Sequence, residues 1–483
     1  MRITAVNPPF LPSYSRGQRS PAVTKSGTLY YPIWLAYAVG ALEKEGHEVD
    51  LVDAPADGLD MESTIERINA FAPELVIVET STPSIESDVK FADSVTTDGR
   101  IVVLVGTHPS ALPAETLKMG VSFTGIVVRE YENPLTGLAR AIENGEDIFA
   151  VKGLYLRREN AEALYTGDAE SITDLDSLPY VSSVYAEHLD INKYNNPNAL
   201  HPQVMIMGGR GCPYQCTFCV FPQTLQGRNF RKRSVENITG EMLWIQDNMP
   251  EVRAVFFEDD TISVDRARLR ELAESFIENG VLISWSSNMR ADVDLETLML
   301  CRKAGLRMVC VGFESGSDEM LANMRKGITT EMSMQFARNA KKAGILVHGC
   351  FMVGTPGETS ETMRMTLELA LELDPDTAQF YPMMVYPGTE AYRQALESGN
   401  ILAENWREWI TETGLHNCVI KTDNLSSAEL VDFCDQARRR FYLRPSYILK
   451  KLWRSLLDAD ERRRTFLAFS TFRKYLFRSS RRR

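Results

Sequence analysis

Residues 208–219 read Gly-Gly-Arg-Gly-Cys-Pro-Tyr-Gln-Cys-Thr-Phe-Cys and set three cysteines, Cys212, Cys216 and Cys219, in a C-x3-C-x2-C array. A short apolar run, Val204–Met207, comes directly before this stretch and predicts a buried strand. Three thiolates on so tight a loop can hold three irons of a four-iron cluster and leave the fourth iron open to a ligand. The stretch therefore predicts an iron–sulfur site at the end of a strand.

Zinc and a disulfide framework are the alternative uses of clustered cysteines. A structural zinc site usually has four ligands, and no second Cys or His pair lies near the loop, since His201 precedes the strand. Disulfide frameworks are typical of small secreted domains. Spacing and ligand number therefore favour the cluster. The remaining cysteines show no C-x2-C pairing, and we expect most of them to be small core residues: Cys301, Cys310, Cys350, Cys418 and Cys434.

A series of strands and helices follows the cysteine loop as far as about residue 384. The predicted strands are 204–207, 254–257, 282–285, 308–312, 346–352 and 377–381. Six βα units without a strong seventh predict an open, partial (βα)6 barrel, and parallel barrels carry their chemistry at the carboxyl ends of the strands. Those ends are unusually polar or Gly-rich: Glu258-Asp259-Asp260, 286–290, 312–316 and 354–358.

The pattern C-x3-C-x-aromatic-C, with Phe218 as the aromatic residue, resembles the signature of radical S-adenosylmethionine (SAM) enzymes. The resemblance implies that Cys212, Cys216 and Cys219 are the catalytic cysteines and ligate a [4Fe-4S] cluster, whose open iron takes the amino and carboxylate groups of SAM. It also implies reductive cleavage of SAM to a 5′-deoxyadenosyl radical, which abstracts hydrogen from an unactivated carbon. In such chemistry the protein supplies positioning and water exclusion, while the cofactors carry the reaction.

The polar strand ends suit the groups that SAM presents. Carboxylates and amides can grip its ammonium and ribose diol, and an Arg suits its carboxylate. By position in the family, the predicted SAM contacts are Phe218, Glu258, Asp259, Asn288, Arg290, Glu314 and Gly354. A lone acidic residue at such a position is more typical of a helix N-cap or a surface ion pair. Recurrence at successive strand ends favours SAM binding.

Residues 1 to about 145 also alternate strands with amphipathic helices. The strands are predicted at 3–6, 49–52, 75–78, 101–105 and 126–128. Apolar strands in this arrangement predict a doubly wound, parallel α/β sheet of Rossmann-like type, with its ligand beyond the carboxyl ends of the strands. No Gly-rich phosphate fingerprint follows the first strand, so a dinucleotide ligand is not expected.

The strand ends and the segment 46–53, GHEVDLVD, resemble the cobalamin-binding domain that precedes the radical SAM domain in one large subgroup of the family. The D-x-H-x-x-G motif, whose histidine binds the lower face of the corrinoid, is absent; many members lack it, so lower-face ligation stays open. For His108 an ordinary loop hydrogen bond is favoured over an approach to cobalt. The resemblance implies cobalamin contacts from Asn7, Pro8, Ser81, Thr82, Gly106, Thr107, His108, Arg129 and Glu130.

The expected domain division is a cobalamin-binding-like domain (1–145), a linker (146–200), the barrel (201–385) and a helical carboxyl-terminal region with a basic tail (386–483). The linker is expected to contain a small hairpin, at 151–157 and 163–165. The basic segment 228–233 is by default a solvated face, and the alternatives are that it neutralises an anionic substrate or a cobalamin edge. Ser234 predicts the start of the first barrel helix.

Charge is unevenly spread along the 483 residues. The net charge is −12, yet from Arg438 onward 16 Lys or Arg stand against 3 Asp or Glu, which leaves −25 on the rest of the chain. Such an acidic body argues against a nucleic-acid partner. The basic and aromatic end, from Arg462 to Arg483, has two interpretations: a helix lying on an anionic membrane surface, or a packed helix with a basic tail.

The beginning of the chain and its cysteines bear on localisation. Met1-Arg2-Ile3 runs straight into a strand-like segment, so no signal peptide is expected, and no apolar run approaches the length of a membrane span. Eight cysteines, most of them scattered, fit a reducing compartment. We therefore expect a cytoplasmic protein, with contact to the inner face of the membrane as the open alternative for its basic end.

The likeness extends from Asn7 to about Pro445 and is strongest to the radical SAM proteins of hopanoid biosynthesis, on segments 233–237, 311–316 and 356–359. Wider relatives include the anaerobic bacteriochlorophyll cyclase and many C-methyltransferases. The resemblance implies that the substrate radical takes a methyl group from methylcobalamin, which consumes a second SAM, or rearranges or cyclises instead. The substrate class implied is a lipid or other secondary metabolite, and the electron donor a flavodoxin or ferredoxin.

Two functions from other classes are alternatives to this enzyme. A non-catalytic corrinoid carrier would need only the first domain, and the cysteine loop argues against it. A zinc or iron–sulfur interaction module would not need five further strand ends lined with polar groups. The sequence does not separate methyl transfer from a non-methylating rearrangement or ring closure of a hopanoid side chain.

Overall fold

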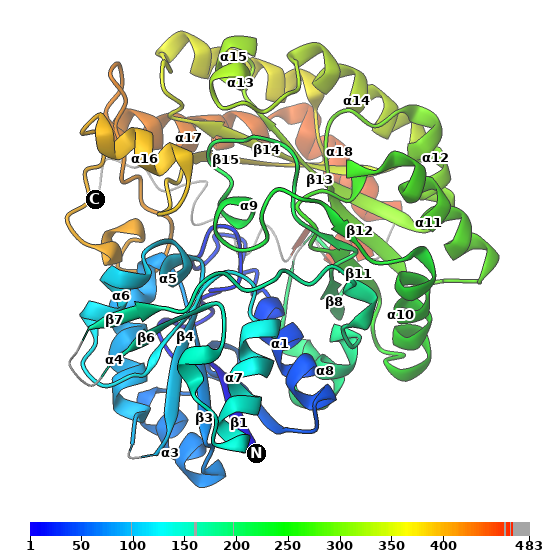
Figure 1. Cartoon of the computed structure of the whole chain (residues 1–483). Helices are drawn as coiled ribbons and strands as arrows, with labels where there is room; N and C mark the ends of the chain where they lie inside the picture. Colours follow the sequence, from blue (N-terminus) through cyan, green and yellow to red (C-terminus); the bar gives the residue numbers. More distant parts are fainter. Residues whose placement is uncertain (98, 159–161, 197, 458–459, 464, 467–483) are drawn as a thin grey trace.

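Two sheets, each flanked by helices, organise the chain (Figure 1). The structure is a computed structural model that describes residues 1–97, 99–158, 162–196, 198–457, 460–463 and 465–466. Alternating apolar strands and amphipathic helices predict this architecture in both halves, and the fold class expected from the sequence is confirmed. The residues expected to form the end of the basic tail, 467–483, lie outside the described ones.

The first sheet has seven strands in the order β2-β1-β3-β4-β5-β6-β7. Its strands are β1 Arg2–Asn7, β2 Glu48–Asp53, β3 Leu75–Thr80, β4 Ile101–Gly106, β5 Gly125–Val127, β6 Leu154–Arg157 and β7 Ala163–Tyr165. The first five strands run parallel, as expected. The hairpin β6–β7 does not stand free in a linker: it adds to the sheet edge antiparallel to β5, because Leu154 and Leu156 face the core.

Strand residues alternate between two cores, which makes the first sheet doubly wound. Ile77 and Val103 face α1 and α7, whereas Val76, Val78 and Val102 face α4. The helices of this region are α1 Ile33–Lys44, α2 Ala54–Asp57, α3 Met61–Phe71, α4 Ile85–Val95, α5 Thr107–Ala111, α6 Pro113–Met119, α7 Glu132–Asn144 and α8 Val181–His188. Helix α1 is buried along almost its whole length, since α7 and α8 also cover it.

The second sheet has six parallel strands in the order β15-β14-β13-β12-β11-β8, and β8 and β15 remain edges, so the barrel is open. The strands are β8 Gln203–Ile206, β11 Ala254–Phe257, β12 Ser284–Met289, β13 Leu306–Glu314, β14 Leu346–Val353 and β15 Thr377–Pro382. The strand expected at 282–285 was wrong at its start: Leu282 is 84% exposed in the preceding turn, and pairing begins at Ser284.

An outer arc of helices covers the second sheet (Figure 1). These helices are α10 Val235–Asn248, α11 Arg266–Glu278, α12 Leu295–Lys303, α13 Asp318–Asn323, α14 Thr330–Ala343 and α15 Ser360–Leu373. Ser234 caps α10 by accepting the Asn237 N–H, which confirms the predicted helix start. Between the strands β8 and β11 lie a short hairpin, β9 Gly209–Arg210 with β10 Arg231–Lys232, and the helix α9 Val220–Thr224.

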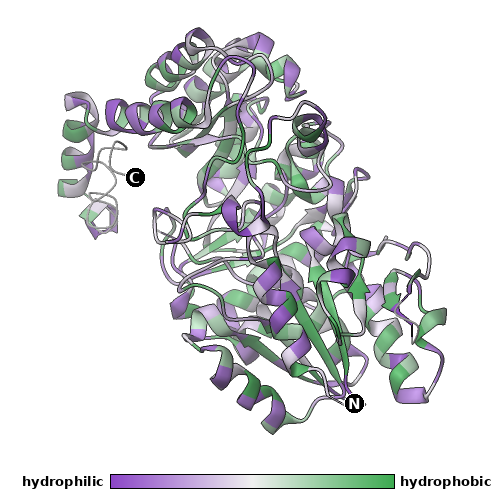
Figure 2. Cartoon of the chain, turned by 90° about the vertical axis from the view of Figure 1, so that its left-hand side faces the viewer, coloured by the Kyte–Doolittle hydropathy of each residue, from purple (hydrophilic) through white to green (hydrophobic). Residues whose placement is uncertain are grey.

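The carboxyl-terminal region is helical, as expected. It contains α16 Glu390–Glu397, α17 Ser427–Tyr442 and α18 Pro445–Leu457, and α17 packs on β15 at the sheet edge. In Figure 2 the strands of the first sheet are mostly hydrophobic, whereas the outer helices alternate hydrophilic and hydrophobic turns. Among the described residues, none of the helices combines the length and apolar character needed to span a bilayer.

Candidate active site

The cysteine loop begins where β9 ends, at the carboxyl end of the strand β8. Cys212 and Cys216 are buried, Cys219 is half-buried, and all three are free thiols. Gly211 precedes the first cysteine with φ of +84°, and a Cβ atom there would come within 2.1 Å of the Asn229 carbonyl oxygen. Because only glycine fits this turn, the backbone fixes where the cysteine array begins.

The spread of the three thiols fits a cluster better than a single zinc ion. Zn–S bonds of about 2.3 Å put the sulfurs of a tetrahedral zinc site about 3.8 Å apart. Within the described part of the chain, Cys212, Cys216 and Cys219 are not a set whose ligand atoms all lie within 4.8 Å of one another. A four-iron cluster takes its thiolates at separate corners and so accepts a wider span. The residues present therefore fit a [4Fe-4S] cluster.

Contacts from other segments hold this loop in place. Arg228 donates to the backbone carbonyl of Tyr214, so this basic residue supports the loop and is not a purely solvated side chain. The Thr217 N–H donates to the Met324 carbonyl, at 3.1 Å. The guanidinium of Arg290 stacks on the Tyr214 ring, 3.6 Å from its centroid. The loop is thus tied to residues near two other strand ends of the barrel.

The acidic residues after β11 are paired with a cation from the first domain. Arg19 forms an ion pair with Glu258 and lies 3.1 Å from Asp260, and the two carboxylates are only 6% and 3% exposed. Burial raises the pKa of Glu258, and Arg19 opposes that rise. The Arg19 guanidinium also lies 5.0 Å from the centroid of the Phe221 ring. A loop of the first domain therefore reaches the barrel rim.

Asp259 keeps one carboxylate oxygen free of protein partners. Its Oδ2 accepts the Gly208 N–H at 2.8 Å, whereas its Oδ1 is buried without a hydrogen-bond partner among the described residues. Burial raises the pKa of Asp259 to about 6. Asn288 donates to the Asp259 carbonyl at 2.9 Å, so the two predicted SAM residues lie together. An orphaned buried acceptor of this kind suits a ligand N–H or O–H donor.

Arg290 and Glu314 meet through one further residue, Lys326. Arg290 donates to the Lys326 carbonyl at 2.9 Å, and the Lys326 ammonium lies 2.8 Å from Glu314. Glu314 also accepts the Tyr381 hydroxyl at 3.2 Å, and its own backbone has φ of +63°. The Phe218 ring lies 5.9 Å from the Lys326 ammonium. These predicted SAM residues are thus connected with the cysteine loop.

Gly354 is the predicted SAM residue that stands apart from this network. Its φ is +94°, and a Cβ atom there would meet Leu430 at 3.1 Å and Ile420 at 3.4 Å. Its N–H donates to Glu358 at 3.2 Å. The glycine therefore faces apolar side chains of the carboxyl-terminal region, and its proximity to SAM stays a prediction.

At the carboxyl end of the first sheet, Asn7 and Pro8 are held by buried charges. The Asn7 side chain donates to Asp53 at 2.8 Å and accepts from Arg16 at 2.8 Å. Arg16 also donates to the Pro8 carbonyl and pairs with Asp88 at 2.7 Å, and both charged side chains are fully buried. The start of the predicted cobalamin site is therefore rigid and leaves few polar atoms of these residues unpaired.

Ser81, Thr82 and His108 form the central part of the predicted cobalamin site. Ser81 bonds Tyr14 at 2.9 Å, and Thr82 Oγ1 lies 3.2 Å from His108 Nδ1. Nε2 of His108 is buried without a partner among the described residues, and burial lowers the pKa of this imidazole to about 3, so it is neutral. The Trp406 ring packs edge-on at 4.8 Å. A neutral imidazole with one free nitrogen fits a corrinoid neighbour.

Four predicted cobalamin residues remain. Gly106 ends β4 and caps α5, and Thr107 is the first residue of that helix. Arg129 has φ of +72°, and its N–H donates to Ser110. Glu130 pairs with Arg231 at 2.6 Å, across the two domains. Glu130 is therefore already neutralised by a protein cation. The cobalamin contacts of this set stay predictions.

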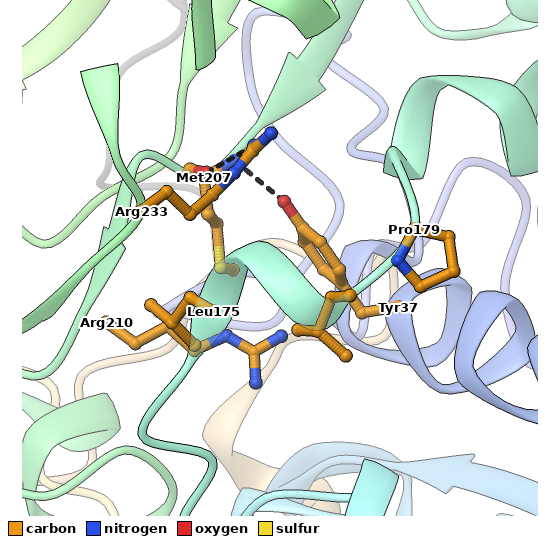
Figure 3. A pocket seen from close by; sticks show the side chains of 7 residues that line it. Tyr37, Leu175, Pro179, Met207, Arg210 and Arg233 are labelled. Atoms are coloured by element: carbon orange, nitrogen blue, oxygen red, sulfur yellow. Dashed lines mark hydrogen bonds between the residues drawn. The ribbon is translucent and has the colours of Figure 1, made fainter. Parts of the chain in front are cut away.

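Arg210, which precedes the cysteine loop, and Arg233 of the basic segment line one small pocket (Figure 3). Arg210 pairs with Glu132 of α7 at 2.6 Å, and its guanidinium faces the Tyr37 ring. Arg233 pairs with Glu241 at 2.6 Å and donates to the Met207 carbonyl. Arg231 joins segment 228–233 to the first domain through its pair with Glu130, whereas Arg233 is buried in an ion pair within the barrel. The interpretation as a solvated face is therefore wrong for Arg231 and Arg233, and neutralisation of an anionic substrate or a cobalamin edge stays a prediction.

Sequence reasoning missed residues that reach the site from distant segments. Arg19 and Tyr30 come from the loop between β1 and α1, and Lys326 follows α13. The raised pKa of the Tyr30 hydroxyl reflects burial first and then the charge of Glu258 and the thiols Cys310 and Cys350. None of these residues lies at a strand end of its own, so no local pattern points to them.

Comparison with known proteins agrees with the two-domain arrangement. Residues 19–139 match the B12 binding domain, and residues 206–370 match the Radical SAM superfamily. The chain is 29% identical to an uncharacterized methyltransferase of Pyrococcus horikoshii over 88% of this chain and 91% of that protein. It is 23% identical to a hopanoid C-3 methylase of Methylococcus capsulatus, over 78% of this chain and 70% of that protein.

A solved structure shares the fold across almost the whole chain. It is the cobalamin-dependent SAM radical enzyme OxsB, determined with aqua-cobalamin and SAM bound. The TM-score is 0.71 at 15% identity, and the match covers 97% of this chain and 72% of OxsB. Identity this low supports the fold alone.

Proposed function

We propose that this chain, a cobalamin-dependent radical SAM enzyme of the methylating or radical-rearranging type, acts on an unactivated carbon of a lipid-like metabolite. Its cofactors are a [4Fe-4S] cluster, SAM and cobalamin. One observation carries the proposal. Three free thiols lie next to an acidic barrel rim, where Oδ1 of Asp259 has no hydrogen-bond partner among the described residues, and Arg19 from the cobalamin-type domain pairs with Glu258 of this rim.

Different side chains would bind the cluster and SAM. Cys212, Cys216 and Cys219 would hold the cluster, which when bound supplies the electron for SAM cleavage. Asp259 would offer its unpaired Oδ1 to the SAM ammonium, and Asn288, which donates to the Asp259 backbone carbonyl, holds this part of the chain in place.

Further contacts come from the rest of the rim. Glu258 is ion-paired with Arg19, Arg290 fixes the segment that carries Lys326, and Glu314 would accept hydrogen bonds from the ribose hydroxyls. Phe218 and Gly354 complete the predicted SAM set.

Cobalamin would lie beyond the carboxyl ends of the first sheet. Thr82 holds Nδ1 of His108 and leaves Nε2 as the free polar atom toward the ligand. Ser81, Gly106 and Thr107 line the same strand ends, Asn7 and Pro8 form the adjacent edge, and Arg129 and Glu130 stand at the next strand. The domain division at residues 145, 200 and 385 remains part of the proposal, and both matched regions fall inside it.

Product analysis under anaerobic conditions tests the reaction. Reconstituted protein is incubated with dithionite and SAM, with and without cobalamin, and 5′-deoxyadenosine and S-adenosylhomocysteine are quantified separately. We expect 5′-deoxyadenosine from the wild type and none from Cys216→Ala, and S-adenosylhomocysteine that requires cobalamin if methyl transfer is the reaction. Cys434→Ala, which alters a buried thiol on α17, is the matched control. Equal behaviour of Cys216→Ala and wild type would refute the radical SAM assignment.

Exposed apolar side chains of helix α18 support the proposal that the substrate comes from a membrane. Its side chains Leu449, Leu452, Trp453, Leu456 and Leu457, spaced three and four residues apart, are each 57–75% exposed, and Phe466 beyond them is 73% exposed. The helix is held against the barrel by Lys450 and Arg454, which pair with Asp374 and Asp376. An apolar stripe with an indole is typical of a helix that lies in a membrane interface.

The positive charge next to this apolar stripe indicates that the stripe binds an anionic bilayer. Arg462 and Arg463 are exposed immediately beyond α18, and the end of the chain is strongly basic. Basic residues beside an interfacial helix are attracted to anionic headgroups. We therefore propose that α18 docks the enzyme on the membrane surface, where a lipid substrate is taken up.

Vesicle flotation tests this docking. Full-length protein is mixed with phosphatidylcholine vesicles, with or without phosphatidylglycerol. We expect flotation with the anionic vesicles and its loss in Leu452→Glu with Leu456→Glu, while Leu282→Glu, at an exposed leucine in a loop of the barrel, still floats. Dimerisation through α18, seen as a mass doubled in wild type alone and no flotation, would assign the stripe to a second copy instead.

A further inference from the structure

Two cysteines that the cluster does not use face each other inside the barrel. Cys310 lies on β13 and Cys350 on β14, and their sulfurs are 3.8 Å apart. In the register of these strands Cys310 is opposite His348, and Gly312 is opposite Cys350. Both thiols are half-buried, whereas their strand neighbours Val309 and Val311 are fully buried against the helices. The two side chains therefore lie on the lumen face of the sheet.

The third member of this group is His348. Its ligand nitrogen and the two sulfurs all lie within 4.8 Å of one another. Nδ1 of His348 lies 2.7 Å from Thr377 Oγ1 on β15, which fixes the orientation of the ring. Burial lowers the pKa of His348 to about 4, so the imidazole is neutral.

A chain of contacts connects this thiol pair with the candidate SAM site. The Lys326 ammonium lies 2.8 Å from Glu314, the last residue of β13, and 5.9 Å from the ring of Phe218 in the cysteine loop. Tyr381, whose hydroxyl donates to Glu314 at 3.2 Å, comes two residues after Gln379, the register partner of Cys350, and therefore shares the sheet face of that thiol. The pair and the candidate radical site therefore share one lumen, and a carbon radical formed there has thiols among its neighbours.

We infer that Cys310 and Cys350 are catalytic residues that form a hydrogen-donating dithiol, which reduces a carbon radical inside the barrel. This inference rests on the proposed radical SAM function and deepens it. An S–H bond is weaker than an alkyl C–H bond, so transfer of a hydrogen atom from thiol to an alkyl radical runs downhill. The two sulfurs, already in contact, are suited to share the oxidation that follows.

The step balances as follows. One S–H bond breaks homolytically, its hydrogen atom bonds to the carbon radical, and a thiyl radical remains. The thiyl sulfur bonds to the neighbouring sulfur while that thiol, which is only half-buried, releases its proton to solvent. The resulting disulfide radical anion passes its extra electron to a one-electron carrier of the flavodoxin or ferredoxin class. A dithiol reductant then restores both thiols.

The protonation state of the pair supports this role. Hydrogen bonding to Cys310, followed by burial, raises the pKa of the Cys350 thiol well above its usual value. A thiol kept protonated is a hydrogen-atom donor, whereas a thiolate is a nucleophile or a metal ligand. The environment of the pair therefore favours radical reduction over thiolate chemistry.

A hydrogen donor also separates the two reaction types that the fold allows. Methyl transfer ends when the substrate radical acquires a carbon, so it needs no hydrogen atom from the protein. A rearrangement or ring closure leaves a product radical that must be reduced before release. The dithiol therefore favours the rearranging or ring-forming branch for this chain.

Solvent deuterium provides the test, with SAM itself as the probe. The holoenzyme is incubated with dithionite and SAM in D2O without added substrate, so that thiol hydrogens become deuterium and the 5′-deoxyadenosyl radical serves as the carbon radical. We expect singly deuterated 5′-deoxyadenosine from wild type and loss of that label in Cys310→Ser and Cys350→Ser. Cys301→Ser and Cys434→Ser, which alter buried thiols outside the lumen, should keep the label.

Two further measurements keep the test independent of folding. Iron content and cluster absorbance must be unchanged in the variants. After a single turnover of pre-reduced wild type, with dithionite removed and oxidised flavodoxin present as the electron acceptor, peptide mapping should find a Cys310–Cys350 disulfide. Unlabelled 5′-deoxyadenosine from wild type and variants alike would overturn the dithiol, whereas absence of 5′-deoxyadenosine from wild type would overturn the proposed function itself. Zinc bound by the wild type and lost in both serine variants and in His348→Gln would also overturn the dithiol, since metal-bound thiolates carry no hydrogen.

Discussion

Arg19 pairs with two buried carboxylates of the other domain. Removing it leaves Glu258, which is 6% exposed, without the partner of its ion pair, and deprives Asp260, which is 3% exposed, of one of the two cations that lower its pKa, the other being Arg228. We expect Arg19→Ala to lower the free energy of unfolding by about 2–4 kcal/mol, because an unpaired buried charge is costly. Urea unfolding measures this loss. Arg67→Ala, at an exposed pair with Asp50, should cost about 0–1 kcal/mol, and equal losses would contradict the buried pairing.

Glu79 is a fully buried carboxyl group whose Oε2 has no partner among the described residues. Burial, followed by the charge of Asp53, raises its pKa from 4.5 to about 8 in the folded protein. Because the folded state holds this proton more tightly, the stability it contributes is present below about pH 4.5 and is lost as the pH rises through about 8.

We therefore expect Glu79→Gln to stabilise the cofactor-free protein at high pH by an amount on the order of 4 kcal/mol. The measurement is the urea midpoint of wild type and variant across this pH range. The two curves should converge in acid and separate as the pH rises. A constant difference at every pH would show that the pKa of Glu79 is the same in the folded and the unfolded protein.

Individual residues could be predicted from the sequence where a short local motif marks them. The cysteine array, the polar strand ends and Ser234 as a helix cap all carry short-range signals, and each lies where expected. Arg19 carries no such signal, since its partner Glu258 is 239 residues away. The dithiol of Cys310 and Cys350 was likewise predicted as core filling, because nothing in two isolated cysteines shows that strand register brings them together.

At the scale of elements, the carboxyl ends of β3 and β4 approach so closely that one residue must be glycine. Gly106 has φ of +135°, and a Cβ atom there would lie 2.4 Å from the Thr80 carbonyl oxygen. We expect Gly106→Ala to destabilise the protein by about 3 kcal/mol or more, because backbone strain adds to the clash. Cobalamin retention on gel filtration should fall with it.

Gly46 provides the matched control. Its φ is +90°, yet no atom would lie within 4 Å of an added Cβ atom. Gly46→Ala should therefore cost only the backbone strain, about 1 kcal/mol. Thermal unfolding of the two variants side by side measures the difference, and equal costs would mean that the contact with Thr80 relaxes.

The sequence did not predict the position of an element where the pairing between strands determines it. The hairpin β6–β7 reads as a local unit in sequence, but its place is set by the free edge of β5, which the sequence does not display. The start of β12 moved for a related reason: Leu282 looks like a strand residue, but the parallel register with β11 begins at Ser284.

At the scale of the whole molecule, the two domains are joined by buried ion pairs. Arg210, beside the cysteine loop, is 1% exposed and pairs with Glu132 of α7. We expect Arg210→Met to cost about 3–5 kcal/mol and the double variant Arg210→Met with Glu132→Leu to recover most of it, because the double change leaves no unpaired buried charge.

Calorimetry would measure both effects on this interface. In Arg210→Met the single unfolding transition should separate into two, one for each domain, and the double variant should regain one transition. Identical behaviour of the two variants would mean that the cation acts through the Trp34 and Tyr37 rings that it also faces.

The loop that carries Arg19 has a consequence for synthesis on the ribosome. Its partners arrive late: Glu258 follows Arg19 by 239 residues, and His416, which bonds Ser20, follows by 396. At roughly 5–20 residues per second, the first of these contacts must wait on the order of 12–48 s. For that interval the nascent first domain exposes a cationic loop without its partners. The first domain can therefore complete its folding only after the second has been synthesised. The amino-terminal half expressed alone should depend on chaperones to stay soluble.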